Sequence, residues 1–490
     1  MWSTFRGFAY NQGSNEDPHR QPCHRQSNCR CGRFFESADT EDMNRTGLRS
    51  FSIIGSPLVA TSTQLRTRRG VTWRVLFLTL YCWITATNVA LAEEESAPDE
   101  APPRGSLVII GGSERFNHRE YWDEIVELAG GPGARIAVFP TASGDPVKKG
   151  GWVISALNKA GADAFLVPVA WKTLTMTPQV AVSDPDLVAQ VREATGIFLI
   201  GGEQDKIVKA LFTPEGEHTL MLDAMWEVYR KGGVIAGTSA GAAVMSRVMF
   251  RDAESVLETM VKGVRWGKEI DRGLGFLDGE WFVDQHLFVR GRFARTLVAM
   301  QNQGFKYGIG VDENSAVIVT KGKDVRVIGY KGALVLDLSR AEHDPNLGQF
   351  NIKNARLTYL DRGDRFDLKT MEVKPAQEKL DDEKLDPNSP EYRPGLRRPL
   401  FYNDILSNTT VIDLMGTLME SVSPVATGLA FDGHAARKHP VDGFEFKFSR
   451  DNDSVAWYTE TYGGDDYTVV NIRLDIRPIK IEGPLYDREK

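Results

Sequence analysis

Short apolar runs alternate with polar, helix-compatible stretches along the middle of the chain. The helix-compatible stretches cover 121–129, 147–160 and 205–212. Runs that are apolar along their whole length fit strands buried on both faces, so the pattern predicts an α/β fold with a mainly parallel, doubly wound sheet. Residues at the carboxyl ends of such strands are candidates for an active site. The apolar runs cover 107–112, 135–142, 164–169, 196–202 and 233–237.

The pattern changes after residue 300. Residues 307–319 and 325–329 look like a strand pair, and 373–399 is charged and contains prolines, as linkers do. Beyond it, a helical piece at 403–421 precedes alternating runs that predict a small antiparallel β module. We therefore expect a main domain at 106–372, a linker at 373–399 and a C-terminal β-rich extension at 400–490.

The first hundred residues have the layout of an export signal. Residues 1–74 form a basic leader that we expect to be disordered, 75–92 form an apolar h-region, and 93–105 form a spacer. The h-region ends in Ala90-Leu91-Ala92, which predicts cleavage after Ala92 and an exported protein, periplasmic or extracellular. An uncleaved membrane anchor is the alternative, but the apolar run is short for a membrane span.

Charge and cysteine content narrow the function further. All four cysteines lie before Ala92, so the mature chain would have no thiol nucleophile and no disulfide. Removing a leader of net charge +5 changes the formal charge from −7 to −12, which argues against nucleic acid binding. The Cys23, His24, Cys29 and Cys31 spacing fits no standard zinc pattern, so we expect neither metal nor cofactor.

One serine stands at a strand-to-helix junction. The run Val234 to Ala236 breaks at Gly237-Thr238-Ser239-Ala240-Gly241 and continues as an Ala-rich, helix-favouring segment. This is the G-x-S-x-G pattern of a nucleophile elbow, in which a tight turn exposes the serine hydroxyl near a helix N-terminus. The alternative is an ordinary Gly/Ser turn, because the short pattern recurs by chance.

A nucleophilic serine needs a base, and His286 has the most informative setting of the histidines. It ends an apolar run as Asp284-Gln285-His286, and Arg290, Arg292 and Arg295 follow. Arginines bind carboxylates bidentately, so this segment predicts a pocket for carboxylates. A solvated basic helix face is the alternative interpretation.

Four motifs in this order carry a family resemblance: GG-x-Q at 201–204, GTSAGA at 237–242, DQH-x-x-x-R-x-R-x-x-R at 284–295 and GIG-x-DE at 308–313. The combination resembles the cyanophycinases, serine peptidases related to the aspartyl dipeptidases. The resemblance spans roughly residues 105–370. It implies a flavodoxin-like fold similar to class I glutamine amidotransferases.

The resemblance also implies roles for individual residues. Ser239 would be the nucleophile and His286 the general base, with Glu254 as the acidic partner and Asp252 as the fallback. Backbone amides of Gly202 and Ala240 would form the oxyanion hole. We expect Asp312 and Glu313 to be a strand-end turn that supports the core. The substrate pocket would be shaped by Gln204, Asp284, Gln285, Arg290, Arg292 and Arg295.

The predicted function is an exported serine exopeptidase that forms an acyl-enzyme and uses no cofactor. Its substrate would be cyanophycin, a poly-aspartate with arginine amide-linked to each side chain, or related β-Asp-Arg type peptides. The alternatives are an α-aspartyl dipeptidase-like enzyme, a catalytically silent acidic-peptide-binding protein, and a glutamine amidotransferase-like domain, which would need a cysteine at the elbow. The chain would contact a membrane only through an uncleaved signal. A homodimer is compatible with the sequence.

Overall fold

The computed structural model describes residues 105–172, 176–253, 255–277, 279–461 and 464–486. The expected leader, h-region and nearly all of the spacer lie outside these residues, as does Glu254. Within the described ranges, no helix is both long enough and apolar enough to cross a membrane.

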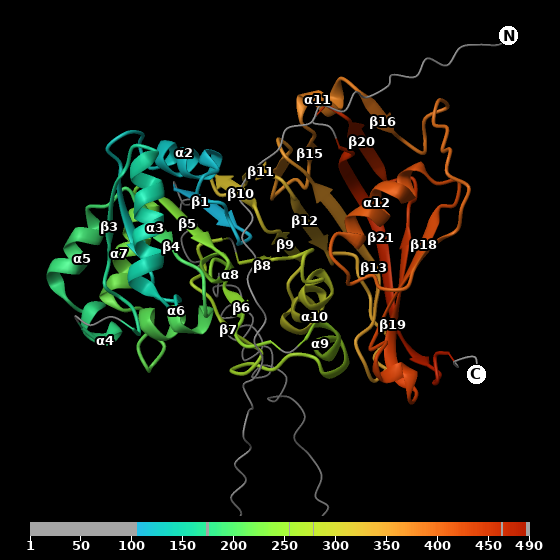
Figure 1. The fold of residues 1–490 in the computed structure, drawn as a ribbon, viewed down its shortest axis with the longest axis horizontal. Helices are drawn as coiled ribbons and strands as arrows, with labels where there is room; N and C mark the ends of the chain where they lie inside the picture. The colour runs from blue at the N-terminus through green and yellow to red at the C-terminus, as the bar shows by residue number, and fades with distance from the viewer. Residues whose placement is uncertain (1–104, 173–175, 254, 278, 462–463, 487–490) are drawn as a thin grey trace, which may run out of the picture. The chain divides into compact units, whose positions relative to one another are not determined.

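A nine-stranded sheet forms the N-terminal part of the described chain (Figure 1). Five neighbouring strands are parallel and lie in the order β1, β5, β4, β2, β3. The predicted parallel, doubly wound sheet is confirmed. The parallel strands are β1 (Ser106–Ile110), β2 (Arg135–Phe139), β3 (Asp163–Leu166), β4 (Gly196–Leu199) and β5 (Val234–Thr238), and antiparallel strands β10 (Ser315–Thr320), β11 (Asp324–Gly329), β14 (Arg365–Asp367) and β15 (Val373–Lys374) extend the β1 edge.

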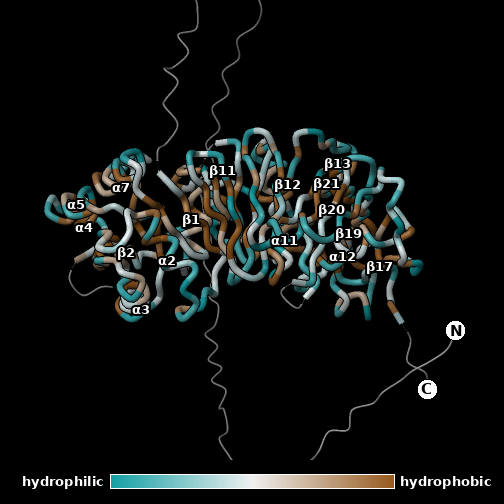
Figure 2. Tube along the Cα trace, turned by 90° about the horizontal axis from the view of Figure 1, so that it is seen from above, coloured by the Kyte–Doolittle hydropathy of each residue, from teal (hydrophilic) through white to brown (hydrophobic). Residues whose placement is uncertain are grey.

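Helices cover both faces of this sheet because its strands are apolar on both sides. Along β1, Val108 and Ile110 pack with α2 (Arg119–Leu128) and α3 (Pro146–Lys159), whereas Leu107 and Ile109 face the opposite layer. Hydrophobic residues accordingly gather along β1 and β11 in Figure 2. The opposite layer contains α4 (Pro178–Ala181), α5 (Pro185–Arg192), α6 (Gln204–Leu211), α7 (Leu220–Arg230) and α8 (Ala240–Ala243).

A second sheet contains strands from both the expected main domain and the expected C-terminal module. Strand β13 pairs with β12 on one side and with the 16-residue β21 on the other. The region 400–490 therefore extends an existing sheet instead of forming a separate one. The neighbouring strands of this second sheet are, in order, β8 (Trp281–Gln285), β9 (Tyr307–Val311), β12 (Ala333–Asp337), β13 (Ile352–Leu360), β21 (Asp466–Ile481), β19 (Val441–Ser449), β18 (Val425–Phe431) and β17 (Leu400–Tyr402). In addition, β20 (Val455–Thr459) pairs with β21, and β16 (Glu383–Leu385) pairs with β20.

The remaining elements connect or cover these sheets. One core cluster unites the second sheet with α9 (Val256–Lys262), α10 (Phe293–Gln303) and α12 (Thr410–Glu420). Strands β6 (Val248–Phe250) and β7 (Ile270–Arg272) form a small antiparallel pair on either side of α9 in the sequence, and Ala435–Arg437 is a short 3-10 helix.

The chain passes directly from one sheet to the other between β9 and β10. The sequence predicted a strand pair over 307–329, and the β10–β11 pair is confirmed, but β9 pairs with β8 and β12 of the second sheet. Only residues 312–314 separate β9 from β10. The backbone of this crossing is therefore anchored in a different sheet at each end.

The segment expected to be a linker is partly buried. It contains β15, the short helix α11 (Gln377–Leu380) and β16. Lys379 on α11 is only 2% exposed, and its Nζ lies 3.2 Å from Asp364 Oδ1 and 3.8 Å from Asp361 Oδ2. Nζ also lies 3.0 Å from the hydroxyl of Thr468 on β21. The buried ammonium thus joins the end of the expected main domain to the C-terminal strands.

Replacing Lys379 should therefore destabilise the fold. Lys379→Met leaves two buried carboxylates without their cation, and breaking a buried ion pair in this way costs about 3–5 kcal/mol. Lys384→Met is the control, because the Lys384 side chain is 53% exposed and its pair with Asp386 should contribute at most about 1 kcal/mol. Urea unfolding followed by circular dichroism measures both variants. Equal midpoints for the two variants would contradict the structural role of Lys379.

Candidate active site

Ser239 lies at the tip of the turn between β5 and α8. Its φ is +53°, a value that side-chain-bearing residues rarely adopt and that marks a strained elbow. The elbow needs its glycines: a Cβ at Gly241 would lie 2.2 Å from the Leu199 carbonyl oxygen, and one at Gly237 would lie 2.4 Å from that of Gly241. The structure therefore forms the predicted strand-turn-helix around Ser239.

His286 reaches this serine from the other sheet. It follows β8 directly, has φ +51°, and donates its backbone N–H to the Gly111 carbonyl at 3.0 Å. Its Nε2 lies 2.8 Å from Ser239 Oγ. A Cβ at Gly112 would come within 2.3 Å of His286 Cε1, so a glycine after β1 leaves room for the imidazole.

Glu313 occupies the other side of the imidazole. Its Oε1 lies 2.6 Å from His286 Nδ1. The expectation that Asp312 and Glu313 only support the core is therefore wrong for Glu313. It fits Asp312, whose Oδ1 accepts the backbone N–H groups of Phe288 and Val289.

Neither acidic residue expected from the sequence is described as a partner of His286. Glu254 lies outside the described residues, and Asp252 is exposed, with no hydrogen bond to His286 among the described contacts. The Nδ1 position that either carboxylate was expected to take belongs to Glu313. The sequence shows only that the Asp312-Glu313 pair follows an apolar run; the structure adds that this run, β9, lies beside β8, the strand that His286 follows.

The environment keeps the imidazole neutral. Burial and, to a smaller extent, the positive charge of Arg290 lower the pKa of His286 to about 4, against the opposing effect of Glu313. Burial alone would raise the pKa of Glu313, but the hydrogen bond from His286 holds this pKa below its usual value. A neutral imidazole that donates from Nδ1 to Glu313 has Nε2 free to accept the serine proton.

The Ser239–His286 pair opens into a cavity of about 410 Å³. Two of the three predicted arginines line it, Arg290 and Arg292. The Arg292 Nη1 donates to the carbonyl and the Oε1 of Gln285 at 2.9 and 2.8 Å, and burial lowers the pKa of Arg292 to about 9. The other predicted residues on the cavity wall are Gly202, Gln204, Gln285 and the Ser239–His286 pair itself.

The third predicted arginine does not line this cavity. Arg295 is buried and binds both carboxylate oxygens of Asp284 at 2.7 and 2.9 Å, and its guanidinium lies 4.1 Å from the Phe250 ring centroid. Desolvation opposes the charge of Asp284, but Arg295 holds the pKa of this carboxyl below its usual value. The pair fixes the start of α10 to the end of β8, next to His286.

Two backbone amides lie where an oxyanion could be bound. Gly202 follows β4 and Ala240 follows the nucleophile, and Gly201 packs so close to the elbow that a Cβ there would lie 3.0 Å from the Ser239 Cβ. Among the described backbone hydrogen bonds, neither the Gly202 nor the Ala240 amide has an acceptor. Both amides therefore remain available to a developing negative charge.

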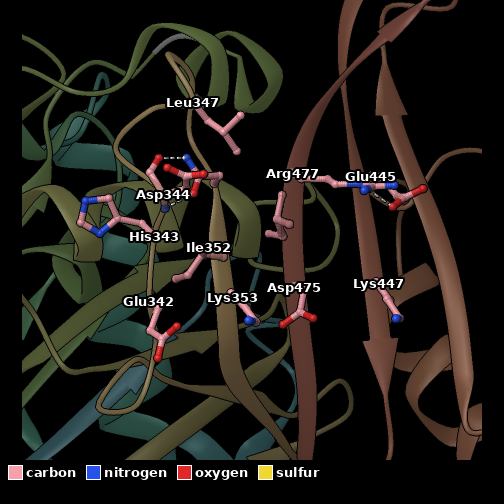
Figure 3. A pocket seen from close by; sticks show the side chains of 12 residues that line it. Glu342, His343, Asp344, Leu347, Ile352, Lys353, Glu445, Lys447, Asp475 and Arg477 are labelled. Atoms are coloured by element: carbon pink, nitrogen blue, oxygen red, sulfur yellow. Dashed lines mark hydrogen bonds and ion pairs between the residues drawn. The ribbon is translucent and has the colours of Figure 1, made fainter.

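A second, larger groove lies on the second sheet and has different chemistry. Its volume is about 620 Å³, and Figure 3 shows its side chains projecting from β13, β19, β21 and the loop before β13. Glu445 pairs there with Arg477 at 2.9 Å. No serine, threonine or cysteine is among the described residues that line it. The Ser239 cavity is therefore the better candidate for covalent chemistry.

The pKa of His286 can be measured from the pH dependence of the reactivity of Ser239. The rate of inactivation by a serine-directed fluorophosphonate should follow the neutral imidazole, with a midpoint closer to pH 4 than to the ordinary 6.5. Arg290→Met should shift the midpoint upward, because it removes a positive charge that disfavours the imidazolium. Arg477→Met, in the other groove, should leave it unchanged. A midpoint near 6.5 in the unsubstituted chain would contradict the buried, neutral histidine.

Comparison with known proteins identifies the family to which the chain belongs. The model of Peptidase family S51 matches residues 107–328, which include Ser239, His286 and Glu313. A cyanophycinase from Geminocystis herdmanii is 32% identical over 278 residues, which cover 54% of this chain and 95% of that protein. A cyanophycinase from a Nostoc species is 28% identical over 292 residues, 58% of this chain and 93% of the relative.

Among solved structures, a peptidase from an acI-B1 Actinobacterium aligns with a TM-score of 0.40 and 18% identity, over 55% of this chain and 98% of that one. The parallel, doubly wound fold is shown by the strand order β1, β5, β4, β2, β3. The family match and the near-complete coverage of the 32% identical relative show that the chain belongs to peptidase family S51 and is a serine-type peptidase.

Proposed function

We propose that this chain is an exported serine exopeptidase that hydrolyses cyanophycin or related β-Asp-Arg type peptides. The observation that carries the proposal is the hydrogen-bonded series Ser239 Oγ, His286 and Glu313 in a cavity lined by Arg290 and Arg292. The cyanophycinase names of the relatives supply the substrate class.

The proposed reaction begins with attack by Ser239 Oγ on the scissile carbonyl carbon. His286 Nε2 accepts the hydroxyl proton, while Glu313 holds the Nδ1–H and stabilises the imidazolium. The Gly202 and Ala240 amides donate to the oxyanion, and the loss of one such donor typically costs about 3–4 kcal/mol. The imidazolium then protonates the leaving amine, and the C–N bond breaks to give the acyl-enzyme. Water deprotonated by His286 hydrolyses the ester and restores Ser239.

Arg290 and Arg292 account for a preference for acidic peptides. Arg290 is exposed at the cavity, and it forms no hydrogen bond or ion pair with another described residue. Arg292 donates from Nη1 to Gln285, and its Nε and Nη2 groups are further donors for a substrate. Guanidinium groups bind carboxylates bidentately, so this wall suits a substrate that carries carboxylates beside the scissile bond.

Export is a separate part of the proposal. It is supported by the apolar run 75–92, which follows Arg66, Arg68 and Arg69 and ends in Ala90-Leu91-Ala92. The absence of cysteine after residue 92 agrees with an oxidising location.

One experiment tests activity and export together. The full chain is expressed in an export-competent host, the N-terminus of the recovered protein is sequenced, and the protein is assayed on cyanophycin, α-aspartyl dipeptides and isoaspartyl peptides. We expect an N-terminus at Glu93 and release of β-Asp-Arg from cyanophycin, with at least about 10⁴-fold loss in Ser239→Ala.

The outcomes separate the two claims. Activity on α-aspartyl dipeptides alone would contradict the cyanophycin assignment and retain the serine mechanism. An intact N-terminus on an active enzyme would contradict processing after Ala92 alone. Full activity of Ser239→Ala would overturn the mechanism.

A further inference from the structure

The catalytic cavity contains a carboxylate that the reaction above does not use. Glu114 follows Gly112 and Ser113 after β1, and it lines the same cavity as Ser239 and His286. Thr238, the residue before the nucleophile, donates its hydroxyl to Glu114 Oε2 at 2.5 Å. The Thr238 side chain is buried, so this contact fixes the carboxylate beside the reacting serine.

This carboxylate has no ion-pair partner among the residues that the structure describes. No described lysine, arginine or histidine forms an ion pair with Glu114, although Lys149 lines the same cavity. Burial raises the pKa of Glu114, and the hydrogen bond from Thr238 opposes that effect. A largely buried carboxylate without an ion-pair partner is costly; the charge of Lys149 offsets part of this cost without pairing, and a ligand cation would offset more of it.

Two aromatic rings that contact each other belong to the cavity lining. Phe116 and Trp152 are 40% and 46% exposed, so part of each ring is open to the cavity. Their ring centroids are 5.8 Å apart in an edge-to-face arrangement, and Phe116 also stacks on the buried Trp122 at 5.7 Å. The rings are therefore held in place while part of their surface stays accessible to a ligand.

Aromatic faces and a carboxylate together favour a planar cation. Lys148 Nζ lies 5.1 Å from the Trp152 ring centroid, a cation–π contact within the protein. A guanidinium stacks on aromatic faces and offers two parallel N–H donors to a carboxylate, which an ammonium group does not. Lys148 and Lys149 oppose a further cation electrostatically, and Glu114 is the group that offsets them.

We propose that Glu114, Phe116 and Trp152 form a subsite for a guanidinium side chain of the substrate. The subsite rests on the proposed function, because it selects among peptides that the Ser239 site cleaves. The cavity then recognises both charges of a β-Asp-Arg unit: Arg290 and Arg292 bind its carboxylates, and Glu114 and the two rings bind its guanidinium.

A pair of matched substrates isolates the guanidinium. A trimer of β-Asp-Arg units is compared with its citrulline counterpart, which replaces each guanidinium by a neutral ureido group and keeps every carboxylate and the terminal amine. We expect the unsubstituted chain to favour the arginine trimer by at least about 10-fold in kcat/KM, as hydrogen bonds to charged groups allow. Glu114→Gln and Trp152→Ala should each reduce this ratio, and Lys149→Met should increase it.

Trp171→Ala is the matched control for the tryptophan variant, because Trp171 is similarly exposed and lies outside the cavity lining. Its ratio should equal that of the unsubstituted chain. Because kcat/KM is compared between two substrates of one variant, a partly folded preparation does not alter the ratio.

Three results would overturn the subsite. If the unsubstituted chain cleaves both trimers equally well, or if Glu114→Gln and Trp152→Ala keep the full preference, these residues do not bind the guanidinium and the peptidase function stands. If neither trimer is cleaved, the proposed function itself fails and the subsite fails with it.

Discussion

The hydrogen bond between Ser239 Oγ and His286 Nε2 joins two sheets, and the rest of the site depends on it. Ser239 directly follows β5 of the first sheet, whereas His286 directly follows β8 of the second. The backbone bond from His286 N to Gly111 O and the short β9–β10 crossing fix the two strand ends against each other. Glu313 lies on that crossing, so the same connection that joins the sheets also aims the carboxylate at the imidazole.

This arrangement requires strain at two residues. Ser239 and His286 both have positive φ, and residues held in such conformations typically cost about 1–3 kcal/mol each. The surrounding packing must supply that stability. One apolar cluster contains residues of both sheets, such as Ile109 of β1 and Val311 of β9. The buried Asp284–Arg295 pair further fixes the strand that presents His286.

The local features of the site could be predicted from the sequence. The apolar runs predicted the parallel strands, the glycines around Ser239 predicted the elbow, and Asp284-Gln285-His286 predicted a histidine at a strand end. Each of these depends on a few neighbouring residues. In the structure Ser239 and His286 are in direct contact, although they lie 47 positions apart in the sequence.

Features that depend on long-range pairing could not be predicted in the same way. Glu313 becomes the partner of His286 only because β9 lies parallel to β8 and the chain then changes sheets. Asp284 and Arg295 were expected in the substrate pocket, but their opposite charges meet 11 residues apart and pair in the interior. Lys379 looked like a linker charge, and its partners come from distant strands. Composition does not reveal which charges will meet.

The identity of the third member of the triad is tested most directly by comparing kcat of Glu313→Gln and Glu254→Gln on the substrate that the unsubstituted chain cleaves. If Glu313 orients and stabilises His286, Glu313→Gln should lose roughly 10³–10⁴-fold in kcat, as in other triads that lose their carboxylate. Glu254→Gln should then stay within a few-fold of the unsubstituted chain. A large loss in Glu254→Gln, with Glu313→Gln close to normal, would contradict the Ser239–His286–Glu313 triad.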